Sequence, residues 1–194
     1  MSYPYADPAR FEGLIDHVER HLGPVDFAVP ASVEGHNRGF AVGVHKHPTI
    51  DMVTAASTGV RFQRYDASLP EEFACSALPG QEQEAAYLVH VVADRVVRSG
   101  KGYEFGRGYV NAEPLIPGSH VQCLLAVPHP WADEDFSHFR NAQGEAVLQI
   151  ITLLPLTRPE LDSMDPRSDP VEQILSLTEA KGLDVRDIYR DSAV

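Results

Sequence analysis

The sequence predicts a single α+β domain. Three segments, at about 7–22, 83–98 and 170–181, repeat apolar residues with the 3.6-residue period of an amphipathic helix. The stretches between them are rich in β-branched and aromatic residues and are bounded by glycine and proline, as strands are. No linker, low-complexity tract or internal repeat separates the two kinds of segment. Strands and helices are therefore expected to share one core, and the domain is expected to span residues 1–194.

The first helix is expected over residues 7–22. Asp7 is a capping residue, and Pro8 occupies the first helical position, where a missing N–H costs nothing. Gly23 and Pro24 end the segment. The apolar residues between these signals predict one buried stripe, formed by Phe11, Leu14, Ile15, Val18 and Leu22.

Strands are expected next, in the N-terminal half of the chain, at 25–29, 40–47, 50–57, 60–65 and 71–78. The second helix follows over about residues 83–98. Its apolar residues lie on one face, and Ser99 and Gly100 mark its end.

The C-terminal half is expected to add strands at 121–127 and 146–154 before the third helix. A segment at 103–111 is rich in glycine and aromatic residues. Tyr103, Phe105 and Tyr109 alternate along it, so they are expected to share one face. Alternation leaves open whether that face is a binding surface or part of the core.

The chain contains 28 Asp and Glu residues against 16 Lys and Arg residues, a formal net charge of −12. Nucleic-acid binding is therefore not expected, because it requires a basic face. The charge favours a basic protein partner, although solubility explains an acidic surface equally well. The two cysteines form no metal-binding spacing, the N-terminus has no signal peptide, and no apolar run is long enough to span a membrane. A cytoplasmic protein without a membrane partner is expected.

Histidines raise the hypothesis of a metal site. His45 and His47 alternate along an expected strand, so both side chains would point to one face, and Asp51 follows shortly after. A transition-metal site needs three or four ligands, and no second histidine motif supplies the others. No nucleophile elbow and no phosphate-binding loop is present either. We expect no catalytic residue, metal or cofactor, and a metal-dependent enzyme using His45 and His47 is the alternative.

An aromatic residue stands beside an acidic cluster in a predicted loop. Trp131 is followed by Asp133, Glu134 and Asp135, a combination typical of a docking patch for a basic partner. The alternative is a solvated turn in which Trp131 packs into the core.

The order of segments resembles the suppressor-of-fused domain family. The resemblance begins at 51–59 (DMVTAASTG), continues after the second helix at 99–106 (SGKGYEFG), and is strengthened by 147–157 (VLQIITLLPLT). The closing segment 184–190 (DVRDIYR) completes the pattern. The resemblance covers about residues 35–190.

The resemblance implies a mixed β-sheet flanked by about three helices, like the N-terminal lobe of the family, and protein binding rather than catalysis. Animal members grip an extended peptide between two lobes by strand addition. Stand-alone bacterial members are regarded as immunity proteins against polymorphic toxins. The chain resembles this bacterial, single-domain type, so the two-lobed clamp is not expected. Two peptide-contacting positions of the animal proteins fall on Arg95 and Arg107, which implies a chemically different ligand.

We therefore expect a non-catalytic, protein-binding domain. Its partner would be another protein or an extended peptide, such as a toxin domain. A homo-oligomeric scaffold, whose partner is another copy of the chain, is a further alternative. The expected binding residues are a groove set and a rim set: Arg95, Tyr103, Arg107 and Tyr109 near a groove, and Trp131, Asp133, Glu134 and Asp135 at its rim.

Overall fold

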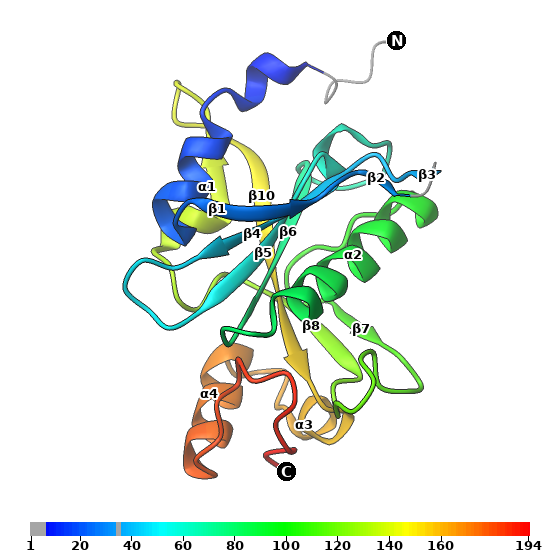
Figure 1. Ribbon diagram of the computed structural model, residues 1–194, viewed down its shortest axis with the longest axis vertical. Helices are drawn as coiled ribbons and strands as arrows, with labels where there is room; N and C mark the ends of the chain where they lie inside the picture. The colour runs from blue at the N-terminus through cyan, green and yellow to red at the C-terminus, as the bar shows by residue number, and fades with distance from the viewer. Residues whose placement is uncertain (1–6, 34–35) are drawn as a thin grey trace.

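The computed structural model describes residues 7–33 and 36–194, and its main feature is a mixed sheet with helices on both faces (Figure 1). The eight strands have the order β1-β4-β5-β6-β10-β8-β7, and β9 pairs with β10 outside this path. Their bounds are β1 (Val25–Val29), β4 (Ala41–Lys46), β5 (Val53–Thr58), β6 (Glu71–Ala77), β7 (Gly108–Val110), β8 (Cys123–Val127), β9 (His138–Arg140) and β10 (Ala146–Leu156). A separate ribbon consists of β2 (Ser32–Val33) and β3 (His36–Asn37). The helices are α1 (Leu14–Leu22), α2 (Glu82–Ser99), α3 (Arg158–Ser163) and α4 (Pro170–Ala180), with short 3-10 helices η1 (Pro8–Phe11), η2 (Val60–Phe62) and η3 (Glu134–Ser137).

The sheet is mixed because its long central strand, β10, pairs in parallel with β6 and antiparallel with β8. A parallel neighbour cannot be reached through a tight turn, so the chain leaves β6 through a long crossover. The first part of that crossover is α2, which packs across β4, β5 and β6. The end of α2 then lies beside the edge strand β7, where Arg95 contacts the ring of Tyr109.

The two faces of the sheet pack against different helices. On β10, Ile151 and Leu153 enter the core beneath α2, whereas Ile150 enters the core beneath α1. Further along the strand, Leu156 packs with Ile174 of α4. Because strand side chains alternate between faces, α2 covers one face, and α1 and α4 cover the other.

Most predicted elements are confirmed within a few residues. Strand β1 has the predicted bounds, and β4, β5, β6, β8 and β10 overlap their predicted strands. Helices α2 and α4 correspond to the predicted second and third helices. The helices carry a helical hydrophobic period, and β8 and β10 are apolar runs of strand-forming residues.

The predicted strand at 60–65 is wrong. Gly59 has φ 115° and directs the chain into η2 instead. The carboxylate of Glu72 accepts the N–H groups of Gly59 and Arg61, which a strand would have offered to a neighbouring strand. A side chain more than ten residues away thus decides this local conformation.

The predicted helix at 7–22 is interrupted. Gly13, with φ 83°, separates η1 from α1. The break changes which side chains are buried: Ile15 is 56% exposed, whereas His17 is buried and its Nε2 lies 3.1 Å from the carbonyl oxygen of Phe136. The expected single apolar stripe is therefore wrong at Ile15.

Helix α3 was not predicted, although the sequence carries a signal for it. The Thr157 hydroxyl accepts the N–H of Glu160, and the Glu160 carboxylate accepts the N–H of Thr157. This reciprocal pair is a capping box, which has the pattern T-x-x-E.

Of the helices that the structure describes, none is long and apolar enough to cross a membrane.

Candidate functional site

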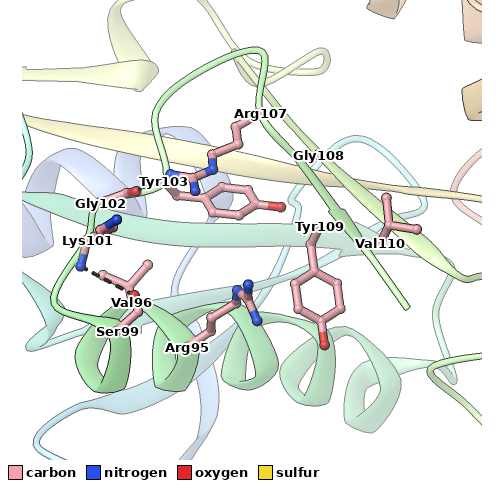
Figure 2. Close-up of a pocket in the computed structure, with 10 residues that line it drawn as sticks. All are labelled: Arg95, Val96, Ser99, Lys101, Gly102, Tyr103, Arg107, Gly108, Tyr109 and Val110. Carbon is pink, nitrogen blue, oxygen red and sulfur yellow. Dashed lines mark hydrogen bonds between the residues drawn. The ribbon is translucent and has the colours of Figure 1, made fainter. Parts of the chain in front are cut away.

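A cavity of about 470 Å³ lies between the end of α2 and the edge strand β7 (Figure 2). Its lining comes from α2, from the loop that follows α2, and from the segment containing β7. We call it the α2–β7 groove, and its residues are Arg95, Val96, Ser99, Lys101, Gly102, Tyr103, Arg107, Gly108, Tyr109 and Val110.

The loop after α2 forms one wall of the groove and is tied to the neighbouring segment. Gly100 ends the helix with φ 67°, and its carbonyl oxygen accepts the N–H of Asp66. The N–H of Gly102 in turn donates to the carbonyl of Asp66. A Cβ on Gly102 would lie 2.5 Å from the Cβ of Ala67, so only glycine fits this close approach.

A buried carboxylate holds the same wall from beneath. Glu71 is fully buried, and its two oxygens accept the N–H of Tyr103 at 3.0 and 2.9 Å. It also accepts the N–H of Glu104 at 3.2 Å and an amide N–H of Gln149 at 3.1 Å. Burial raises the pKa of Glu71, although these hydrogen bonds oppose the shift. The loop conformation, including the positive φ of Glu104, thus depends on a carboxylate in the sheet.

The floor and one side of the groove are aromatic. Tyr103 is buried, its hydroxyl donates to the carbonyl of Leu124 at 3.0 Å, and its ring meets Phe73 edge to face. Burial raises the pKa of this tyrosine, and the nearby Arg107 and Arg95 oppose the shift. The hydroxyl of Tyr103 therefore stays protonated near neutral pH, and its hydrogen bond ties the ring to β8.

Three basic side chains belong to the groove. The guanidinium of Arg95 lies 5.5 Å from the ring centroid of Tyr109, and Arg107 Nη1 donates to the carbonyl of Gly102 at 2.9 Å. Lys101 stands at the start of the loop, and all three side chains are exposed. None of the described residues that line the groove is acidic. The groove is therefore a basic site.

The groove adjoins an open sheet edge. Strand β7 is the last strand of the sheet order, and within the described chain it pairs with β8 alone. The N–H of Asn111 donates to Gln122, and the carbonyl of Arg107 accepts an N–H from β8. Residues that bond to a neighbouring antiparallel strand alternate with residues that do not. Gly108 and Val110 therefore direct their backbone N–H and C=O groups outward.

The structure brings the four groove residues of the sequence analysis together, because Arg95, Tyr103, Arg107 and Tyr109 all line this cavity. The expected alternation along a single strand is wrong, however. Tyr103 and Phe105 precede β7, because the positive φ of Glu104 and of Gly106 interrupts extended backbone. Phe105 instead contacts the ring of His138, with the centroids 5.8 Å apart.

The expected rim residues lie elsewhere. Trp131 is partly buried on the face opposite α2, where its ring meets His129 edge to face at 5.8 Å. Asp133, Glu134 and Asp135 are exposed at η3, which packs against α1. The sheet separates them from the α2–β7 groove, so they do not form its rim.

The histidines of the metal hypothesis have separate backbone contacts. His45 is buried with Nδ1 2.8 Å from the carbonyl oxygen of Gly23, and His47 lies beyond the end of β4. His47 Nδ1 accepts the N–H of Ile50 at 3.0 Å. Among the described residues, no group of three His, Cys, Asp or Glu side chains is arranged to hold a metal ion.

The two cysteines are free and buried. Burial raises the pKa of Cys75 to about 12, so its thiol stays protonated near neutral pH. Neither the histidines nor the cysteines therefore add a reactive group to the groove.

Two solved structures are similar to this chain in fold. No protein-family model matches the sequence, and no curated protein matches it. A SUFU (suppressor of fused protein) homolog from Neisseria gonorrhoeae superposes with a TM-score of 0.64 at 17% identity, over 97% of this chain and 98% of that one. Drosophila Suppressor of Fused superposes with a TM-score of 0.64 at 13% identity, over 93% of this chain and 50% of that one.

The chain is thus an α+β domain built on one mixed sheet, as predicted. More particularly, it has the suppressor-of-fused fold, which confirms the fold implied by the sequence resemblance. It spans about half the length of the Drosophila protein.

Proposed function

We propose that the chain is a non-catalytic, protein-binding domain and that the α2–β7 groove is its docking site. The observation that carries this proposal is the open edge of β7 beside a cavity with aromatic and basic walls. The fold supports it, because the family that the sequence resembles is known for binding proteins.

Strand addition is the binding mode that suits this site. An extended segment of the partner would pair with the outward N–H and C=O groups of Gly108 and Val110. Main-chain hydrogen bonds of this kind provide affinity, and pockets beside the strand provide specificity. Val110 is 45% exposed and the ring of Tyr109 faces α2, so one side chain of the added strand could enter the groove.

We further propose that binding neutralises the partner, as an immunity protein neutralises a toxin domain. The net charge of −12 supports this role, because an acidic surface accelerates the capture of a basic protein. The exposed Asp133, Glu134 and Asp135 contribute to that field from the opposite side of the sheet.

The test starts with a partner. A protein encoded next to this chain, or one that co-purifies with it, would be purified, and its affinity measured by calorimetry with Val110→Pro and Val110→Thr. Proline at an outward edge position removes one free N–H and keeps the pairing with β8. Threonine retains both the N–H and the β-branched shape.

We expect Val110→Pro to weaken binding by at least about tenfold, and Val110→Thr by less than about twofold. Equal melting temperatures of the two variants would show that the fold is retained. Wild-type affinity in Val110→Pro would refute docking by strand addition at β7.

A further inference from the structure

Cations gather at the α2–β7 groove although the chain as a whole is acidic. The described lining of the groove includes Arg95, Lys101 and Arg107 and contains no acidic residue. The chain as a whole has 28 Asp and Glu residues against 16 Lys and Arg residues. Charges of one sign in a concave site focus the electrostatic potential there. The lining of the groove therefore carries charge of the opposite sign to the net charge of the chain.

The two arginines of the groove have no carboxylate partner within the part of the chain that the structure describes. Arg95 lies over the ring of Tyr109, and Arg107 donates one N–H to the carbonyl of Gly102. Each guanidinium carries five N–H donors, so both keep donors for a ligand. Elsewhere in the described part of the chain, the arginines that contact a carboxylate include Arg61, Arg98, Arg158, Arg167, Arg186 and Arg190.

The arginines approach one space from two walls. In Figure 2, Arg95 extends from α2 toward β7, and Arg107 reaches back across the opening toward Gly102 and Tyr103. Both arginines line the same cavity as Tyr103. The ring of Tyr109 and the carbonyl of Gly102 restrain them, so little side-chain entropy is lost when they bind an anion.

Among the described residues, no acidic side chain lines that space. Glu71 lies beneath the wall, but it is fully buried and its oxygens accept N–H groups of Tyr103, Glu104 and Gln149. Asp94, on the exposed side of α2, is paired with Arg98 at 2.8 Å. The free N–H donors of Arg95 and Arg107 are therefore available to an anion from outside the described chain.

We propose that the α2–β7 groove binds an extended peptide segment that carries an aspartate or glutamate side chain, whose carboxylate is held between Arg95 and Arg107. The inference rests on the proposed function, since it names the chemistry of the segment that adds to β7. A peptide fits better than a small free anion, because the outward N–H and C=O groups of Gly108 and Val110 lie beside the cations. Guanidinium–carboxylate hydrogen bonds supply the specificity.

The probes are two acetylated and amidated pentapeptides. One has the order threonine, valine, glutamate, valine, threonine, and the other has glutamine in place of glutamate. Binding to the ¹⁵N-labelled chain would be followed by amide chemical shifts in 50 mM NaCl. We expect shifts within 95–110 and an affinity for the glutamate peptide at least about tenfold higher than for the glutamine peptide.

Variants separate the carboxylate site from the strand edge. The double variant Arg95→Gln/Arg107→Gln should abolish the preference for glutamate, whereas Lys181→Gln, which removes an exposed cation after α4, should retain it. Val110→Pro should weaken both peptides equally.

Three outcomes would overturn the inference. Equal affinity for both peptides, with shifts at the edge of β7, would leave the proposed docking function intact and exclude the carboxylate preference. Shifts with inorganic phosphate at matched ionic strength, but with neither peptide, would identify a small-anion site. No shifts within 95–110 with any of these probes at 5 mM would exclude an anion site in the groove.

Discussion

The two faces of the sheet use their charged and titratable groups differently. On the α1 face, Arg61 is paired with the buried Glu72, and His17 contacts the carbonyl of Phe136. On the α2 face, Arg95 and Arg107 border a cavity, and no described carboxylate pairs with them. The comparison separates charges that stabilise the fold from charges that remain available to a ligand.

The largest expected effect that tests this comparison is a loss of stability in acid, which originates on the α1 face. His129 is buried against the ring of Phe136, and burial lowers its pKa to about 3 from an ordinary value of 6.5. The folded state therefore disfavours protonation. The contribution of the neutral His129 to the free energy of unfolding is complete above pH 6.5, and it is lost as the pH falls toward 3. We expect His129 to account for about 4 kcal/mol of this loss, measured by urea unfolding at successive pH values.

Substitution of His129 measures how much of the loss of stability in acid is due to this residue. In His129→Gln, the slope of stability against pH between 6 and 4 should fall by about 1.4 kcal/mol per pH unit relative to wild type. His120→Gln is the matched control, because it makes the same substitution at a histidine that is largely exposed. An unaltered slope in His129→Gln would show that His129 does not govern acid stability.

Removal of an arginine from the α1 face should have the next largest effect. Arg61 Nη1 lies 2.6 Å from Glu72, whose side chain is only 4% exposed, and its guanidinium lies over the ring of Phe62. Arg61→Ala leaves a buried carboxylate without its cation, so we expect a loss of about 3 kcal/mol in urea unfolding. Arg98→Ala removes an exposed pair and should cost about 0.5 kcal/mol or less. Similar losses for the two variants would contradict the distinction between buried and exposed ion pairs.

The sequence predicted the fold correctly where a single hydrophobic pattern extends over a whole helix or strand. Helix α2 repeats apolar residues with a helical period, and β10 is a long run dense in Ile, Val and Leu, so the existence of both elements followed from the pattern. The prediction for the segment after Gly59 was wrong because the conformation of this segment depends on Glu72, which belongs to the next strand. A glycine with positive φ and a distant hydrogen-bond acceptor leave almost no periodic signal.

The site was predictable only in part, for a similar reason. Tyr103 and Tyr109 were found by composition, and Arg95 and Arg107 by the family resemblance. Glu71, which holds the loop of the groove, was not found, because its hydrogen-bond partners lie 32 and 33 residues away along the chain. Its sequence context is that of an ordinary strand start.

The smallest expected effect on stability belongs to the groove. Arg95 and Arg107 are exposed, and their contacts are a ring face and one carbonyl. An exposed cation–π contact contributes about 0.5–1 kcal/mol. In urea unfolding, Arg95→Gln/Arg107→Gln should therefore lose no more than about 1 kcal/mol.

A loss close to that of Arg61→Ala would mean that the groove arginines also stabilise the fold, and the difference between the two faces would disappear. A small loss, together with loss of the glutamate preference, would show that the charges serve a ligand. The stability measurement is therefore needed to interpret the binding measurement. Only a variant that remains folded can attribute a change in peptide affinity to the carboxylate site.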